Sequence, residues 1–119
     1  MGKRINSIVK ILEEKKAENI QVFDMNGKDY FVEQVIVATT MGERHGASLL
    51  DTLKTELKKQ GENFLNIEAS SEWIVIDLGD ILIHLLTPEF RIKYNLEEFL
   101  AKRNETINNT KTLEKYNGR

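Results

Sequence analysis

The stretch from Trp73 to Leu86, WIVIDLGDILIHLL, constrains the fold more than any other part of the chain. Two runs rich in β-branched residues flank a short polar segment, which is the pattern of two antiparallel strands joined by a turn. We therefore expect strands at 73–77 and 81–86, with a two-residue loop formed by Leu78 and Gly79. The alternative is a three-residue loop with Gly79 in the left-handed conformation, which would shift the pairing by one residue.

The two-residue loop divides the predicted hairpin into two unlike faces. It places Asp77 opposite Asp80 and Trp73 opposite His84 on one face. The other face is core and consists of Ile74, Ile76, Ile81 and Ile83. Two carboxylates that face each other across strands repel unless a cation, a proton or a basic group lies between them. This aspartate pair is the sharpest chemical signal in the chain, and it has two interpretations.

The first interpretation is an enzyme that performs nucleotidyl or phosphoryl transfer. Asp77 and Asp80 would hold Mg²⁺, because a hard cation takes oxygen ligands and phosphate oxygens complete its shell. Such enzymes also surround the phosphates with glycine-rich backbone and basic residues. The segment TTMGERH at 39–45 has one glycine followed by Glu43, and it contains neither GxGxxG nor GKS/T. We therefore favour the second interpretation, a binding surface without catalysis, cofactor or metal.

Four further side chains could support this surface. Arg44 and Arg91 could each neutralise the aspartate pair from a neighbouring element, or lie solvated at the surface. His45 could begin a helix or pair with Asp77. His84 is expected to be a packed, hydrogen-bonded core residue, with a place in a binding face as the alternative.

The N-terminal half of the chain predicts helix, strand, strand and helix. Apolar spacing indicates one helix that ends near Lys16 and another that opens between residues 41 and 45 and closes at Gly61. Between them, Asn26-Gly27 is a strong turn signal. The run VIVA at 35–38 is apolar throughout, as in a strand that is covered on both faces.

The C-terminal half predicts a short strand in NFLNIE, the hairpin, and two short helices. Pro88 suits the first position of a helix because proline has no N–H to satisfy, and Asn95 with Glu98 resembles a capping box. The whole order indicates a single α/β/α domain over residues 1–103, with helices on both faces of a mixed sheet of about five strands. Residues 104–119 form a polar C-terminal tail.

The charge distribution favours a protein partner over a nucleic acid. The chain has a net charge of −2, but residues 68–98 contain seven acidic and two basic residues, a local charge of −5. An acidic region prefers a basic protein surface, whereas non-specific nucleic-acid binding draws on clustered Lys and Arg. The chain has no cysteine and no apolar run near the ~20 residues of a membrane span, so we expect a cytoplasmic protein.

The segment EWIVIDLGDILIHLLTPEFRIKYNLEEFL, residues 72–100, resembles the signature of the ribosomal silencing factor family, RsfS or Iojap. The shared pattern is a tryptophan, an apolar strand, D-x-G-D, an apolar strand with a histidine, a P-E-x-R-x-x-Y helix start and L-E. The segment DYFVEQVIVATT, with ERH and the leucine-striped helix after it, resembles the family's N-terminal half. The resemblance covers about residues 5–100.

The resemblance implies a fold like that of nucleotidyltransferases without their catalytic residues. It also implies docking on the fourteenth protein of the large ribosomal subunit, at the intersubunit face, so that the small subunit cannot join and translation is damped when nutrients are scarce. A homodimer through the same apolar face is a further expectation. Motif position and charge assign the contacts to Trp73, Leu78 and Tyr94 as apolar anchors and to Asp77, Asp80 and Glu89 as charged groups.

Overall fold

Nine helices and strands follow one another in the predicted order in the computed structural model, which describes residues 2–28 and 30–102. Their bounds are α1 Gly2–Glu14, β1 Glu18–Asp24, β2 Gln34–Thr39, α2 Glu43–Lys59, β3 Asn66–Ala69, β4 Trp73–Asp77, β5 Ile81–Leu86, α3 Pro88–Tyr94 and α4 Leu96–Ala101. The predicted tail at 104–119 lies outside the described residues.

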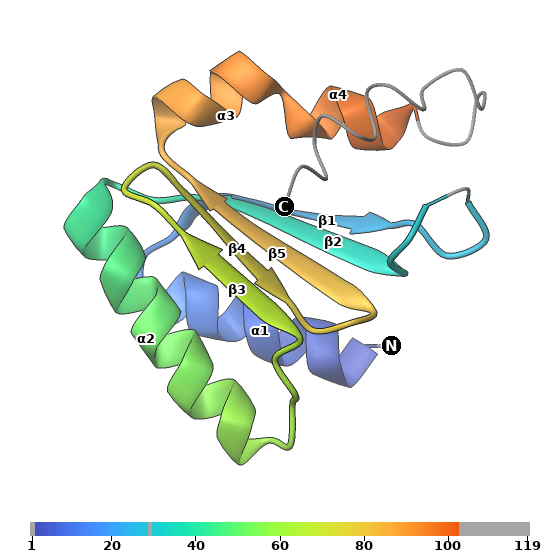
Figure 1. The fold of residues 1–119 in the computed structure, drawn as a ribbon, viewed down its shortest axis with the longest axis horizontal. Helices are drawn as coiled ribbons and strands as arrows, with labels where there is room; N and C mark the ends of the chain where they lie inside the picture. The colour runs from blue at the N-terminus through green and yellow to red at the C-terminus, as the bar shows by residue number, and fades with distance from the viewer. Residues whose placement is uncertain (1, 29, 103–119) are drawn as a thin grey trace.

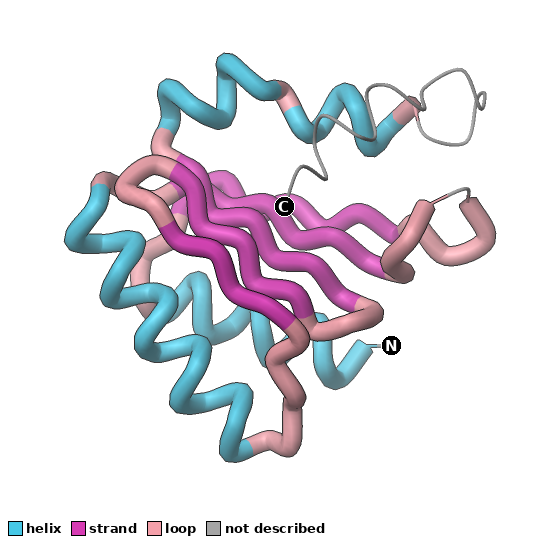
Figure 2. Tube along the Cα trace, in the orientation of Figure 1, coloured by secondary structure: helices cyan, strands magenta, loops and turns pink. Residues whose placement is uncertain are grey.

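The strands form one mixed sheet in the order β1-β2-β5-β4-β3. The central strands β2 and β5 are parallel, and every other neighbouring pair is antiparallel. Helices α1 and α2 lie on one face and α3 and α4 on the other (Figures 1 and 2). Covering on both faces explains why all six residues of β2 are buried, and the predicted α/β/α architecture is confirmed.

Each face of the sheet has its own apolar core. Under α1 and α2, the helix leucines Leu49, Leu53 and Leu57 pack on the isoleucines of β4 and β5. Their spacing of four residues puts them on one stripe of α2. On the opposite face, Phe99 and Leu100 of α4 pack against inward-facing residues of β2 and β5. Helix α3 connects β5 to α4 and therefore lies on the same face of the sheet as α4.

The hairpin register differs from both predicted versions. Asp77 pairs with Leu82 and Trp73 with Leu86, which is two residues away from the predicted pairing. The turn residues are Gly79 and Asp80, and the Leu78 N–H donates to the Ile81 carbonyl at 2.9 Å. Gly79 has φ +98°, a conformation that suits the first position of a primed turn and that a leucine would adopt only with strain. A shift by two leaves the side chains on their predicted faces.

Two helix ends follow their sequence signals in different ways. Helix α2 stops at Lys59, and Gly61 takes φ +90° just beyond it, as predicted. Asn95 does contact Glu98, but through its side-chain amide, which donates to Oε1 at 2.9 Å. Its backbone is left-handed and its N–H donates to the Arg91 carbonyl, so Asn95 ends α3 rather than forming the predicted capping box.

Candidate functional site

Asp77 and Asp80 do not face each other, so the predicted carboxylate pair is wrong. Asp77 is buried, and its Oδ1 accepts a hydrogen bond from the Gly79 N–H at 2.8 Å, which shapes the turn. Asp80 is bound by the guanidinium of Arg4, whose Nη1 and Nη2 donate to its two oxygens at 2.6 and 3.0 Å. These hydrogen bonds hold the pKa of Asp80 below its usual range.

Arg4 connects three parts of the chain. Besides Asp80, it binds Glu62 through Nε and Nη2, at 2.7 and 2.9 Å. The guanidinium therefore joins α1 to the β4–β5 turn and to the segment after α2, and its own pKa is raised by both carboxylates. The sequence did not reveal this cation, because 76 residues separate it from Asp80.

Arg44 and Arg91 do not neutralise the aspartates. Arg44 lies exposed in the first turn of α2, beyond the C-terminal end of β2, whereas Asp80 precedes the start of the parallel strand β5. Parallel strands place these two positions at opposite edges of the sheet. A surface position had been one of the two predicted alternatives for Arg44, and it is the one observed.

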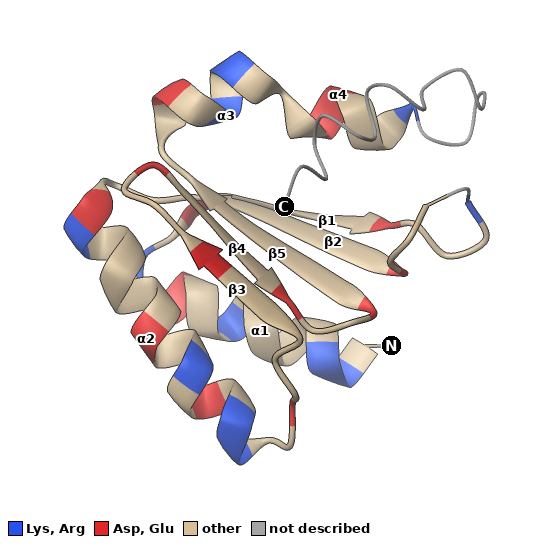
Figure 3. Cartoon of the chain, viewed as in Figure 1, with Lys and Arg blue, Asp and Glu red and all other residues tan. Residues whose placement is uncertain are grey.

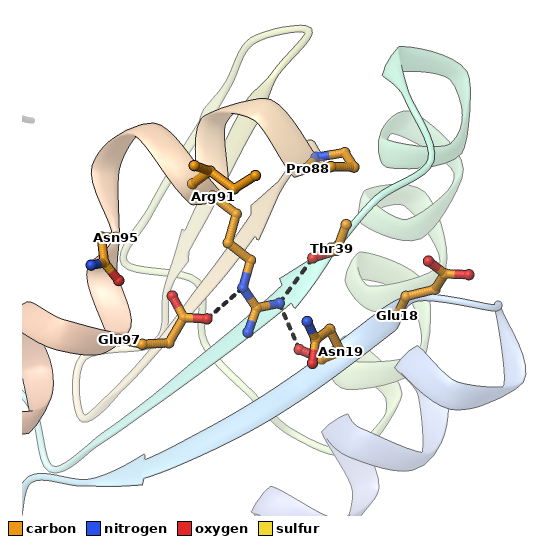
Figure 4. A pocket seen from close by; sticks show the side chains of 8 residues that line it. Glu18, Asn19, Thr39, Pro88, Arg91, Asn95 and Glu97 are labelled. Atoms are coloured by element: carbon orange, nitrogen blue, oxygen red, sulfur yellow. Dashed lines mark hydrogen bonds and ion pairs between the residues drawn. The ribbon is translucent and has the colours of Figure 1, made fainter.

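Arg91 is neither an aspartate partner nor a surface residue. It is only 7% exposed, and its Nε donates to Glu97 at 2.7 Å (Figure 4). Its Nη1 donates to the Asn19 carbonyl at 2.6 Å and to the Thr39 hydroxyl at 2.9 Å. A register irregularity in β1, where Asn19 has φ +54°, accompanies this contact. Arg91 therefore ties α3 to both β1 and β2.

Both histidines have structural partners. His45 Nδ1 accepts from the Met41 N–H at 2.9 Å, and its Nε2 lies 2.7 Å from the Lys15 carbonyl, where it donates. It therefore secures the start of α2 against the end of α1, which confirms the helix-start alternative and not the pairing with Asp77. His84 is buried and its Nδ1 accepts from the Trp73 indole N–H at 3.0 Å, as expected of a packed core histidine.

An aromatic row joins β4 to α3, and we define it as Trp73, Tyr94 and Phe90. Ring centroids are 4.9 Å apart between Trp73 and Tyr94 and 5.5 Å apart between Tyr94 and Phe90. All three side chains are half-buried, and the Lys93 ammonium lies 5.3 Å from the Tyr94 centroid. Leu78 is not part of this surface. It is 8% exposed in the core under α1 and α2, which does not fit an exposed anchor.

A hollow lies beside the aromatic row, at the C-terminal ends of β2 and β5. Helix α2 leaves β2 toward one face of the sheet and α3 leaves β5 toward the other, and such switch points are where open α/β sheets bind ligands. We name it the switch-point hollow. It is lined by Met41, Gly42, Glu43, Ser71, Glu72, Thr87, Pro88, Glu89 and Phe90.

The charged residues that line the switch-point hollow are all acidic. Figure 3 shows them in red where α2 and α3 begin and in the β3–β4 loop. Glu43, Glu72 and Glu89 are exposed and form no ion pair with any described residue. Phe90 belongs both to the hollow and to the aromatic row, so the two form one continuous surface. The sequence indicated Glu89 but not the hollow, because its lining comes from three separate segments.

Two features are absent from the described residues. Across 2–28 and 30–102, there is no group of three or more His, Cys, Asp and Glu side chains arranged to hold a metal ion. Within the same ranges, no helix combines the length and apolar character that crossing a membrane requires.

Comparison with known proteins gives consistent matches over nearly the whole chain. Residues 2–118 match the family model "Ribosomal silencing factor during starvation". A Haemophilus influenzae protein named ribosomal silencing factor RsfS is 30% identical over 99 residues, covering 82% of this chain and 97% of that protein. A mouse protein named mitochondrial assembly of ribosomal large subunit protein 1 is 25% identical over 104 residues, covering 83% of this chain and 46% of that protein. A crystal structure of a Chromobacterium violaceum protein has a TM-score of 0.77 at 27% identity, covering 85% of this chain and 88% of that one.

Proposed function

This chain belongs to the ribosomal silencing factor family, and on that premise we propose that it binds the large ribosomal subunit and keeps the small subunit from joining. The proposed contact is the fourteenth protein of the large subunit, at the intersubunit face, and the setting is the cytoplasm under nutrient limitation. Such a block requires bulk at the right place and enough affinity to compete with the small subunit. It requires no chemical step.

The continuous surface of the aromatic row and the switch-point hollow carries this proposal. Tryptophan and tyrosine dominate the energetics of protein interfaces because they bury a large area at low entropic cost. Trp73 and Tyr94 are half-buried and their rings are in tilted contact, so little further ordering is needed when a partner covers them. The neighbouring carboxylates suit a basic ribosomal protein and disfavour the phosphates of ribosomal RNA.

The choice of the large subunit has separate support. The mouse relative is named for assembly of the mitochondrial large ribosomal subunit, although this chain covers only 46% of that protein. A role at the same subunit agrees with a surface that fits a basic protein. The alternative function, a magnesium-dependent transferase that uses Asp77 and Asp80, is disfavoured. The turn and Arg4 hold these two carboxylates apart.

Co-sedimentation with purified large subunits, followed by a subunit-joining assay, tests the proposal. We expect the wild type to bind and to block joining. Tyr94→Ala removes the centre of the aromatic row, and Glu89→Lys reverses an exposed charge without touching the core. Each change should weaken binding by about ten-fold, since loss of a central aromatic contact or of charge complementarity costs on the order of 1–2 kcal/mol.

The matched control is Glu13→Lys, which makes the same charge reversal on the exposed side of α1. It should bind like the wild type. Circular dichroism and thermal melting establish that all variants are folded. Wild-type protein that fails to sediment with large subunits, or that binds without affecting joining, would contradict the proposal.

We also propose that a homodimer forms through the aromatic row and competes with ribosome binding. Sedimentation velocity over a range of concentrations should show a dimer in the wild type that Tyr94→Ala weakens. A dimer unaffected by Tyr94→Ala would place self-association on another surface.

A further inference from the structure

We propose that the switch-point hollow receives a lysine or arginine side chain of the partner protein. This inference rests on the proposed docking function and specifies the chemistry of one contact within it. It depends on three properties of the hollow that are independent of one another: its charge, an unpartnered hydroxyl in its lining, and its apolar walls.

The charge of the hollow selects a cation. Two helix N-termini meet there, and each carries the equivalent of roughly +0.5 charge, which would favour an anion such as a phosphate. Glu43, Glu72 and Glu89 reverse this balance, and the hollow has no basic lining residue. With the helix contribution included, the net charge is roughly −2. The hollow therefore disfavours the phosphate that two helix N-termini alone would favour.

An unused hydroxyl supplies the second observation. Thr87 lines the hollow, is 8% exposed and stands at the N-cap of α3. A threonine at this position ordinarily accepts a hydrogen bond from the first turn of its helix, but Thr87 makes no such bond. Its Oγ1 is buried and has no hydrogen-bond partner among the described residues. A buried hydroxyl without a partner is costly, and because this oxygen is enclosed, an incoming N–H donor satisfies it by displacing the side chains around it.

The apolar walls explain why a long basic side chain fits better than a free ion. Met41 is 64% exposed at the rim, and Pro88 and Phe90 form the adjoining wall. Lysine and arginine lay their methylene stems along apolar surface while the charged end reaches polar groups. The carboxylates belong to three different segments and do not gather as metal ligands among the described residues.

A small probe tests the hollow without the ribosome. N-acetyl-arginine methylamide is titrated into the ¹⁵N-labelled full chain while the backbone amides of Glu72, Thr87 and Glu89 are followed by NMR. We expect saturable shifts with a dissociation constant on the order of 10 mM, as for a single side chain. The uncharged probe N-acetyl-norleucine methylamide and Mg²⁺ alone should not produce these shifts.

Charge-matched variants assign the probe to the hollow. The double variant E72Q/E89Q removes two carboxylates from it, and E13Q/E14Q removes two exposed carboxylates from α1. The arginine probe should bind several-fold more weakly to E72Q/E89Q and unchanged to E13Q/E14Q. Equal shifts with the norleucine probe, shifts produced by Mg²⁺ instead, or arginine binding that survives in E72Q/E89Q would each overturn the inference.

Binding to large subunits then separates this inference from the proposed function. If E72Q/E89Q binds about ten-fold more weakly than E13Q/E14Q, the hollow takes part in docking. If the two variants bind large subunits equally well, the hollow plays no part in docking and the inference is wrong, while the proposed function stands. If the wild type does not bind large subunits, the proposed function fails. The titration with the small probes then decides alone whether the hollow binds a basic side chain.

Discussion

At the scale of single residues, the strongest constraints come from two arginines that link segments far apart in the chain. Arg91 joins α3 to β1 and β2, and Arg4 joins α1 to the β4–β5 turn. Their surroundings differ, because Arg91 is buried whereas the Arg4–Asp80 pair is about 40% exposed on each side, at 42% and 41%. Burial strengthens an ion pair and makes its disruption costly, whereas exposed pairs contribute little.

Replacing Arg91 by methionine should lower the free energy of unfolding by about 2–4 kcal/mol. The change leaves Glu97 without its 2.7 Å partner and the Asn19 carbonyl and Thr39 hydroxyl without a donor. Urea unfolding followed by circular dichroism measures the loss. Arg44→Met is the matched control, since it removes an exposed arginine, and it should stay within about 0.5 kcal/mol of the wild type. A similar loss in both variants would contradict the structural role of Arg91.

Asp80 should make stability depend on pH in acid. Hydrogen bonds from Arg4 lower the pKa of Asp80 in the folded state, so its contribution is present above the ordinary pKa of 3.8 and disappears as the pH falls through the lowered value. Asp80→Asn should therefore be less stable than the wild type at neutral pH, by no more than about 1 kcal/mol because the pair is exposed. Thermal melts between pH 7 and 2 should converge at the acid end. If the melting temperatures of wild type and Asp80→Asn instead moved apart as the pH falls, the predicted direction of the pH dependence would be wrong.

At the scale of elements, the sequence predicted the helices and strands, which depend on residues close together in the chain. It did not predict the hairpin register or the switch-point hollow, which depend on the folded arrangement. Strand and helix order follows from local apolar periodicity, which is why VIVA and the leucine stripe of α2 were assigned correctly. The hairpin faces were also correct, but the register was not, because it depends on whether leucine or glycine takes the strained turn position. Trp73 and Tyr94 came from a motif, whereas the switch-point hollow depends on three segments that only the sheet brings together.

The turn of the β4–β5 hairpin should be sensitive to the conformation of Gly79 alone. A Cβ at this position would meet no atom within 4 Å, so Gly79→Ala introduces no clash, but φ is +98°. We expect Gly79→Ala to reduce the free energy of unfolding by about 1–3 kcal/mol, because an L-residue adopts this region only with strain. Gly79→Asn should lose less, since asparagine tolerates positive φ. Equal stability of wild type and Gly79→Ala in urea would contradict the observed turn.

At the scale of the whole molecule, acidic charge and exposed aromatic surface are concentrated in one segment of the chain. Residues 68–98 carry a charge of −5, although the complete chain carries only −2. The aromatic row lies within the same segment. Asp77 and Asp80 lie at the opposite edge of the sheet, but Glu72 and Glu89 lie beside the row. A partner that is both basic and apolar in its centre would therefore meet the edge that carries the row, in a defined orientation.

Binding to large subunits should weaken with salt without disappearing. Raising the ionic strength from about 0.1 to 1 M shortens the screening length from roughly 10 to 3 Å, which suppresses the attraction of the acidic segment but not the burial of the aromatic row. The association rate should fall by about ten-fold or more and the dissociation rate should change little. Surface plasmon resonance on immobilised large subunits separates the two rates. A salt effect confined to dissociation would argue against long-range steering.

The parallel pairing of β2 with β5 also has a consequence for synthesis of the chain. Gln34 pairs with Ile81, so the centre of the sheet joins residues that are 47 positions apart in the chain. At a synthesis rate of about 5–20 residues per second, β2 waits roughly 2–9 s for its partner strand to be made. Until then β2 has only β1 beside it, and its other edge is unpaired. A nascent copy therefore cannot assemble the proposed docking surface until β5 and the helix after it, which carries Phe90 and Tyr94, have been made.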